Sequence, residues 1–120
     1  MRDFLNVTKA LGDETRVRAL LTVKDDELCL CQIIEILGLS PSTVSKHMSV
    51  LHNAGLIERR KEGKWHFYRL ADGTTHPTAR RALDWAVAEL ANDKTIKADA
   101  RRAREVRREE LEELSACYRS

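Results

Sequence analysis

Two short amphipathic helices with almost no chain between them are the feature that most constrains the fold. Apolar residues recur at spacings of three and four, which is typical of one buried helix face. They are Leu30, Ile33, Ile34 and Leu37 in the first helix and Val44, Met48 and Leu51 in the second. Gly38 follows the first helix, where a left-handed residue commonly ends a helix. Ser40 and Pro41 are a typical helix start. Such a pair, joined by a tight turn that contains glycine, is a helix-turn-helix.

A predicted β-hairpin follows this pair of helices. Strands are expected over residues 56–60 and 65–70, with a turn over residues 61–64. Two helices precede the pair, the second of them capped by Asp13, and Pro77 begins another helix after the hairpin. This order of elements predicts a mainly α chain with a small β-hairpin, a winged helix-turn-helix.

The exposed side of the second helix is a candidate DNA-reading surface. In a helix-turn-helix this helix lies in the major groove, with its N-terminal residues nearest the bases. Small hydroxyl side chains permit close approach to bases and phosphates, and lysine adds positive charge. The candidates are Ser40, Ser42, Thr43, Ser45, Lys46, His47 and Ser49. His47 lies at the margin and is open to two interpretations, a phosphate contact or a partly buried helix residue.

The predicted hairpin adds a second basic segment. Its candidate DNA contacts are Arg59, Arg60, Lys61 and Lys64. On an isolated hairpin such residues would indicate only a solvated edge protected against aggregation, but beside a helix-turn-helix they favour DNA binding. Residues 40–70 carry six basic and two acidic residues, although the 120-residue chain has a net charge of only +2. The near-neutral total therefore hides a basic segment.

A pair of cysteines, Cys29 and Cys31, is the other informative feature. With Cys117 there are three cysteines, an odd number that cannot form a closed set of disulfides. Thiolates suit soft ions such as trivalent arsenic and antimony, or divalent cadmium, lead and mercury. Residues two apart do not face each other in a regular helix. The pair therefore binds one ion only at a loose helix entrance or in a distorted first turn, and two small buried residues are the other interpretation of this spacing.

An ion held by this pair would act on the predicted DNA-binding unit. The cysteines lie at the start of the helix that supports the reading helix. A distortion there shifts the helix-turn-helix away from the geometry that binds DNA. By linkage, DNA binding must then weaken the ion's affinity by the same factor.

Three stretches together resemble the ArsR/SmtB family of bacterial metal-responsive repressors, in its arsenic-sensing branch. Residues 27–33 resemble its thiolate metal-binding box, residues 11–16 its opening helix signature and residues 40–47 its recognition helix, within a likeness that spans roughly residues 4–91. The resemblance implies a winged-helix homodimer, paired through the first helix and the helix after the hairpin, that represses an operon on double-stranded operator DNA until its ion arrives. Zinc-type sensors of this family carry Asp and His ligands on the last dimer helix. Residues 79–89 contain no His, which disfavours that subtype.

The sequence departs from the family pattern at one position. Several arsenic sensors with this box place a third cysteine three residues after the second, where this chain has Ile34, a residue of the predicted core stripe. Because trivalent arsenic normally takes three sulfurs, the resemblance points to Cys117, from the same or the partner subunit, or to a small cellular thiol. A frayed tail without function is the other interpretation of Cys117. The expected metal ligands are Cys29, Cys31 and Cys117, with trivalent arsenic (arsenite) or antimony as inducer and no organic cofactor.

The C-terminal residues differ in pattern from the rest of the chain. Residues 94–120 are expected to form a charged helical C-terminal extension that carries Cys117, after a DNA-binding and dimerisation domain at residues 1–93. An exposed helix is expected because its ion pairs have four-residue spacing. These pairs are Arg101–Glu105 and Arg108–Glu112, and the apolar residues Ile96, Val106, Leu111 and Leu114 are too few for a full core face.

The main hypothesis is a DNA-binding repressor that arsenic or antimony releases from its operator. Two alternatives keep DNA binding and use the same cysteines to sense cadmium or lead, or an oxidant or persulfide. A metal-buffering or thiol-reductase protein is disfavoured, since the chain has no C-x-x-C pair. We recognise no catalytic set, which predicts that the protein is not an enzyme. The N-terminus lacks an apolar signal core and no run of residues is long enough to span a bilayer, so a cytoplasmic protein without a membrane partner is expected.

Overall fold

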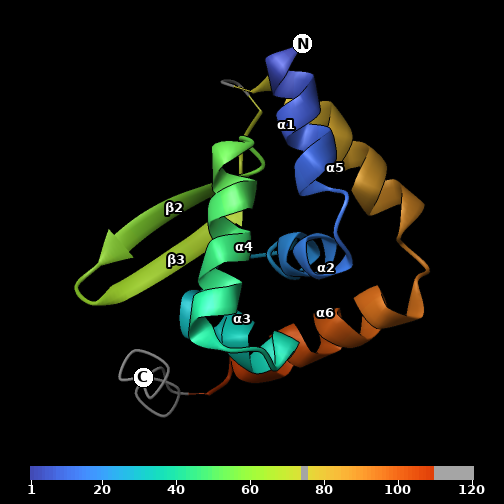
Figure 1. Ribbon diagram of the computed structural model, residues 1–120. Helices are drawn as coiled ribbons and strands as arrows, with labels where there is room; N and C mark the ends of the chain where they lie inside the picture. Colours follow the sequence, from blue (N-terminus) through green and yellow to red (C-terminus); the bar gives the residue numbers. More distant parts are fainter. Residues whose placement is uncertain (74–75, 110–120) are drawn as a thin grey trace.

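The computed structural model describes residues 1–73 and 76–109, and its elements follow the predicted order (Figure 1). They are α1 (Arg2–Ala10), α2 (Glu14–Thr22), β1 (Leu28–Cys29), α3 (Leu30–Leu37), α4 (Pro41–Asn53), β2 (Ile57–Glu62), β3 (Trp65–Leu70), α5 (Pro77–Glu89) and α6 (Lys94–Val106). Cys117, the predicted ion-pair partner Glu112 and the apolar residues Leu111 and Leu114 lie outside the described residues.

The predicted helix-turn-helix is formed by α3 and α4. Gly38 ends α3 with a φ of 69°, a left-handed conformation that residues with a Cβ rarely adopt. Ser40 caps α4, where its Oγ accepts a hydrogen bond from the Thr43 N–H at 3.3 Å, and Pro41 is the first helical residue. The predicted stripe is fully buried and consists of Val44, Met48 and Leu51. The local sequence therefore determines both the turn and the buried face of α4.

A third strand, which the sequence did not predict, pairs with the hairpin. The antiparallel sheet has the order β1-β3-β2. In β1, Leu28 lies opposite Tyr68 and Cys29 lies opposite Phe67. A two-residue strand is too short to show alternating hydrophobicity, so only tertiary pairing reveals it. The consequence is that the cysteine segment belongs to the sheet of the wing.

The hairpin itself is tighter than predicted. β2 continues to Glu62, which pairs with Trp65 at the start of β3. The turn therefore needs fewer residues than the predicted 61–64, and Gly63 provides the left-handed conformation with a φ of 59°. The wing is correspondingly longer and projects away from the helices (Figure 1).

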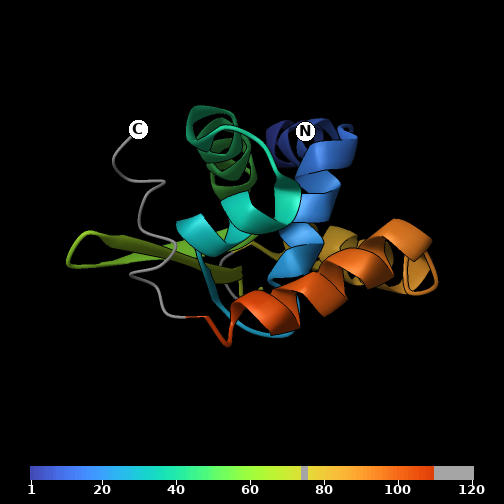
Figure 2. The ribbon, with the colours of Figure 1, turned by 90° about the horizontal axis from the view of Figure 1, so that it is seen from below.

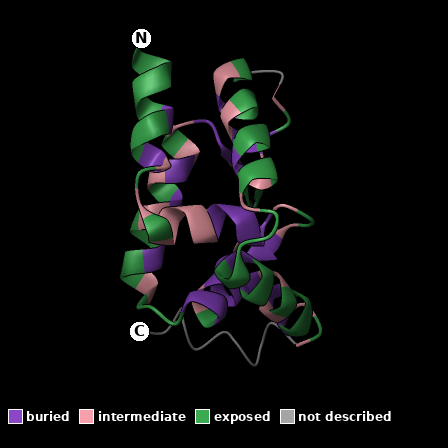
Figure 3. Cartoon of the chain, turned by 90° about the vertical axis from the view of Figure 1, so that its right-hand side faces the viewer, coloured by how far each residue is buried: buried purple, intermediate pink, exposed green. Residues whose placement is uncertain are grey.

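The helices enclose one core, with α2 in the middle. α1 packs beside α5, and α6 packs across α2 and α3 (Figures 1 and 2). Buried residues gather where the helices meet, whereas the outer faces are exposed (Figure 3). Among the fully buried large side chains are Leu20, Ile33, Met48, Leu56 and Leu83. Within the described residues, no helix is long and apolar enough to cross a membrane.

The expectation of an exposed α6 with a sparse apolar face needs correction. Ile96, Ala103 and Val106 are all buried. Between them Asp99 is only 7% exposed and accepts hydrogen bonds from Arg18 of α2, Nε to Oδ2 at 2.9 Å and Nη2 to Oδ1 at 3.0 Å. Ala103 and the paired Asp99 complete the buried face. The sequence prediction counted only large apolar residues and therefore missed both. The hydrogen bond to Asp99 also raises the pKa of the Arg18 guanidinium.

The surface ion pairs of α6 also differ from the predicted ones. Glu105 pairs with Arg102 at 3.0 Å, rather than with Arg101. Arg102 also reaches Glu35 of α3 at 3.0 Å. A charged residue of α6 therefore forms an ion pair with α3, in addition to the ion pairs within α6.

Replacement of Asp99 tests whether α6 is part of the folded core. Asp99→Ala should lower the free energy of unfolding by about 2 kcal/mol, because it leaves Arg18 partly buried without its partner. Urea unfolding followed by circular dichroism measures this change. The matched control is Asp84→Ala, which breaks the exposed Arg80–Asp84 pair of α5 and should change stability by less than about 0.5 kcal/mol. Equal effects of the two substitutions would contradict the packing of α6 described above.

Candidate DNA-binding surface and cysteine site

The N-terminal half of α4 presents the predicted polar surface. Its side chains outside the buried stripe are exposed at Ser42, Thr43, Ser45, Lys46 and Ser49. Because the buried stripe holds the opposite face of α4 against the core, this surface is rigidly presented. Such a surface suits insertion into a DNA groove.

Several of the predicted DNA-contacting residues of this segment have intramolecular partners. The Ser40 hydroxyl donates to Thr43 Oγ1 at 2.8 Å in addition to its capping bond. His47 is half-buried, and its Nδ1 lies 3.4 Å from Arg16 Nη1 of α2. Arg16 in turn donates from Nε to the Ala10 carbonyl at 3.0 Å. The structure thus gives Ser40 a capping role and joins His47 to the α1–α2 turn.

The four basic residues of the predicted wing do not form one surface. Because side chains alternate along a strand, Arg59 and Lys61 lie on one face of β2 and Arg60 lies on the other. Arg59, Lys61 and Lys64 are exposed. Arg59 lies opposite the buried Tyr68. Burial raises the pKa of the Tyr68 hydroxyl, and a hydrogen bond with Arg59 opposes that change.

Arg60 is engaged on the opposite face of the sheet. Its Nε donates to Glu27 Oε2 at 2.9 Å, and its Nη1 donates to Glu62 Oε2 at 2.9 Å. Its guanidinium also lies over the Phe67 ring, 4.3 Å from the centroid. These carboxylates, Glu27 first, raise the pKa of Arg60 above its ordinary value. Two of the three hydrogen-bonding and stacking partners, Glu27 and Phe67, lie outside β2.

Cys29 lies at the junction between β1 and α3. It is the N-cap of α3 and has an extended backbone, with φ −74° and ψ 153°. Its N–H donates to Gln32 Oε1 at 2.7 Å, the arrangement of a capping box. Cys31 lies in the first turn of the helix, and both side chains are buried, 0% and 2% exposed. Cys29 thus lies at the entrance of the helix, and this entrance is closed by the Gln32 cap and is not the loose one that the spacing of the pair requires for binding one ion.

The end of α6 contacts this junction. Gln32 Nε2 donates to the Val106 carbonyl at 3.5 Å, so one buried side chain contacts both Cys29 and α6. Arg107 Nη2 donates to the Asp26 carbonyl at 2.8 Å, in the loop before β1. The role of Gln32 was missed from the sequence. Its position three residues after the N-cap was the available signal, although cysteine is an unusual N-cap.

Within the described residues, no three His, Cys, Asp or Glu side chains are grouped so that they would hold a metal ion. Cys29 and Cys31 lie together in the chain, and Cys117 falls outside the described residues. A three-sulfur site therefore needs a third sulfur from beyond residue 109 or from a small cellular thiol.

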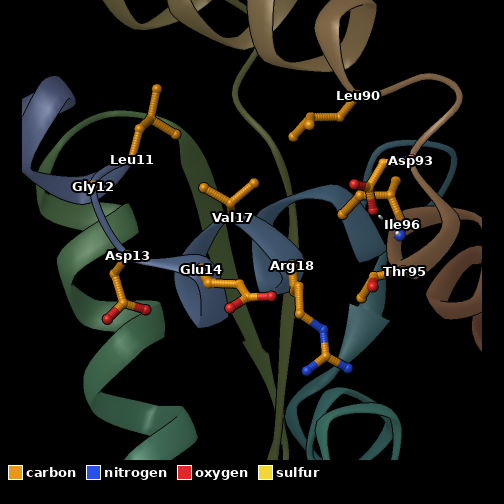
Figure 4. Close-up of a pocket in the computed structure, with 10 residues that line it drawn as sticks. All are labelled: Leu11, Gly12, Asp13, Glu14, Val17, Arg18, Leu90, Asp93, Thr95 and Ile96. Atoms are coloured by element: carbon orange, nitrogen blue, oxygen red, sulfur yellow. Dashed lines mark hydrogen bonds between the residues drawn. The ribbon is translucent and has the colours of Figure 1, made fainter.

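A separate pocket of about 320 Å³ lies between the α1–α2 turn and the α5–α6 turn (Figure 4). Two of its carboxylates are helix caps, since Asp13 accepts from the Arg16 N–H and Asp93 accepts from the Ile96 N–H, both at 3.0 Å. The first of these bonds holds the pKa of Asp13 below its ordinary value. No cysteine lines the pocket, so it is distinct from the cysteine junction.

An apolar surface covers the neighbouring faces of α1 and α5. Phe4, Leu5 and Trp85 are 57%, 53% and 65% exposed. A groove of about 470 Å³ runs between the two helices, and Phe4 and Trp85 both line it. Exposed aromatic side chains along a groove are typical of a surface that contacts another protein.

Comparisons with known proteins agree with this architecture. The family model described as bacterial regulatory protein, arsR family, matches residues 13–59. The arsenic resistance transcriptional regulator ArsR1 of Pseudomonas putida is 35% identical over 112 residues, which cover 88% of this chain and 84% of that protein. A homologue of the cadmium resistance regulatory protein CadC from Staphylococcus aureus is 42% identical over 71 residues, which cover 58% of this chain and 59% of the homologue.

A solved structure extends the likeness to the fold. The homodimeric winged helix-turn-helix DNA-binding domain of Mb0332 from Mycobacterium bovis, a possible ArsR-family regulator, has a TM-score of 0.62 and 28% identity. The match covers 77% of this chain and 83% of that one. The predicted winged helix-turn-helix is thereby confirmed. This chain belongs to the ArsR family of DNA-binding transcriptional repressors, which are not enzymes.

Proposed function

We propose that this protein represses transcription from an operator and leaves it when trivalent arsenic or antimony binds Cys29, Cys31 and Cys117. The observation that carries the proposal is the position of Cys29, which is both a residue of the wing sheet and the N-cap of α3. An ion bound there acts on both parts of the DNA-binding unit. The arsenic resistance regulator that aligns with most of this chain supports the choice of ion.

Chain length supports Cys117 of the same subunit as the third ligand. The Val106 carbonyl accepts a hydrogen bond from Gln32, whose side chain also accepts the Cys29 N–H. Eleven residues lead from Val106 to Cys117, which span up to about 36 Å when extended. This length is ample to return to the cysteine junction. Arsenite enters as As(OH)₃, and each thiol proton leaves with one hydroxide as water, so three As–S bonds replace three As–O bonds.

The mechanism follows from the backbone of Cys29. We infer that Cys29 changes its extended backbone geometry, which now pairs it with Phe67 and caps α3, when its sulfur binds the same ion as Cys31. The change moves the start of α3, and with it α4, which packs on α3. A rigidly presented reading surface then no longer fits the groove. Linkage requires that DNA binding weaken arsenite binding by the same factor.

Serine substitutions test the ligand set. With cysteines reduced, arsenite should weaken wild-type binding to DNA by about 5- to 150-fold, the usual range of allosteric coupling. Cys29→Ser and Cys31→Ser should bind DNA normally and lose this response, and Cys117→Ser should need more arsenite. Fluorescence anisotropy on a duplex selected by the wild-type protein from a random-sequence pool measures these affinities.

Each result of this titration has a distinct meaning. DNA affinity of the wild type that arsenite and antimonite leave unchanged would contradict ion sensing, whatever the DNA affinity itself. A full response in Cys117→Ser removes that residue from the ligand set. Zinc serves as the control ion and should have a weaker effect, because zinc usually takes four tetrahedral ligands and this set offers only two or three thiolates.

Cadmium is the second candidate inducer. The homologue of the cadmium regulator CadC has 42% identity to this chain over 71 residues. A cysteine pair at a helix entrance also offers soft ligands to cadmium. A response to cadmium with none to arsenite would favour this function. A response to oxidant alone would favour redox sensing by the same cysteines.

The DNA contacts in this proposal come from two elements. On α4 they are Ser42, Thr43, Ser45, Lys46 and Ser49, and on the wing they are Arg59, Lys61 and Lys64, all exposed. Lys46→Ala and Lys61→Ala should each lower the salt dependence of binding by about one counterion per subunit. The control Lys97→Ala removes an exposed lysine of α6 and should leave the slope unchanged. Identical slopes for all three variants would contradict this placement of the DNA.

We also assign the apolar α1–α5 surface to a homodimer. The related Mb0332 domain is homodimeric, and a two-fold dimer lets two α4 helices read two half-sites. Trp85→Glu should give a monomer with weakened DNA binding, measured by sedimentation velocity and anisotropy. Leu39→Glu changes an exposed apolar residue elsewhere and should remain dimeric. A dimeric Trp85→Glu variant would place the interface on another surface.

A further inference from the structure

We infer that Glu27 and Arg60 form a link between the cysteine segment and the wing, so that Arg60 positions the wing and does not contact DNA. This inference rests on the proposed ion-sensing function and names the residues that transmit its signal to the hairpin. Glu27 is the positioning partner of Arg60. Neither residue touches the ion.

The register of the sheet places Arg60 and Cys29 in one row of cross-strand neighbours. Arg60 of β2 lies opposite Phe67 of β3, and Phe67 lies opposite Cys29 of β1. Glu27 lies two residues before Cys29. The salt bridge from Arg60 to Glu27 therefore spans the whole sheet, from one edge strand to the segment that leads into the other.

The contacts of Arg60 fix its direction. One side of its guanidinium donates to Glu27 at 2.9 Å, another donates to Glu62 at 2.9 Å, and the plane stacks on Phe67. The Arg60 side chain is thus held from three places: Glu27 before β1, Glu62 at the end of β2 and Phe67 in β3. A phosphate would have to displace two carboxylates, whereas Arg59 and Lys61 on the other face form no ion pair with an acidic residue within the described residues.

A link of this kind matters because β1 is short. Only Leu28 and Cys29 pair with β3, which gives few hydrogen bonds to hold the segment. The Glu27–Arg60 bridge adds an attachment just before β1, on the side away from α3. When an ion draws Cys29 out of the sheet row, Glu27 moves with it and releases Arg60, which changes the orientation of the wing. An exposed salt bridge contributes little to stability, so this role is one of geometry.

A second ion pair on the sheet provides a matched control. Arg69 of β3 bonds to Glu58 of β2, Nε to Oε2 at 2.8 Å. The pair joins the two wing strands and does not reach β1. Glu58→Gln removes one carboxylate from the sheet, as Glu27→Gln does, but leaves the cysteine segment attached.

The test compares DNA affinity with and without arsenite in these variants. Glu27→Gln and Arg60→Gln should each reduce the arsenite-induced loss of affinity at least threefold, and the double variant should show no further reduction. Arsenite affinity of the DNA-free protein should stay within twofold of wild type, since the thiols are untouched. Glu58→Gln should retain the full response. An undiminished response in Glu27→Gln would overturn the inference, as would an equal reduction in Glu58→Gln.

Two further readouts do not depend on the response to arsenite. Arg60→Gln should leave the salt slope of DNA binding unchanged, whereas a direct phosphate contact would lower it by about one per subunit. Glu27→Gln should increase hydrogen exchange at the amides of residues 28 and 29, and Glu58→Gln should not. A lowered salt slope in Arg60→Gln, or unchanged hydrogen exchange in Glu27→Gln, would refute the link even if arsenite does not change DNA binding by the wild type. If only the ion-sensing proposal fails, arsenite leaves wild-type DNA binding unchanged, but the salt slope and the hydrogen exchange still show the expected results.

Discussion

The backbone of Cys29 is the point at which the two parts of the DNA-binding unit are joined. On one side it pairs with Phe67 of the wing sheet, and on the other its N–H is held by Gln32 in the first turn of α3. A well-packed interior transmits displacement instead of absorbing it. A change at this residue therefore reaches both the hairpin and the helix-turn-helix. In the proposed function, an ion bound at this sulfur acts on DNA binding through this geometry.

The parts of the fold that follow local rules could be predicted from the sequence. Gly38 needs a left-handed conformation, Ser40 supplies a cap oxygen and Pro41 lacks an N–H, so these residues define the helix-turn-helix without any tertiary contact. β1 and the buried face of α6 depend on distant partners. Asp99 is buried because Arg18, 81 residues earlier in the chain, binds it.

In the candidate site, too, features set by the local sequence could be predicted and features set by distant partners could not. The exposed residues of α4 follow from helical periodicity, as Lys46 illustrates. The sequence shows a run of basic residues in the wing but not their partners. Arg60 lies among other cations in the chain, yet one of its two carboxylate partners, Glu27, is 33 residues away. Strand alternation then separates Arg60 from Arg59 and Lys61, so fewer cations share one face of the wing than residue counting suggests.

The central claim is that ion binding at the cysteines and DNA binding are coupled, so that each weakens the other. The most direct test is the affinity for arsenite of the reduced protein, measured free and bound to its selected duplex. Reciprocal coupling requires that DNA lower arsenite affinity by the same factor, within error, by which arsenite lowers DNA affinity. Equal arsenite affinities of the free and DNA-bound protein would contradict it.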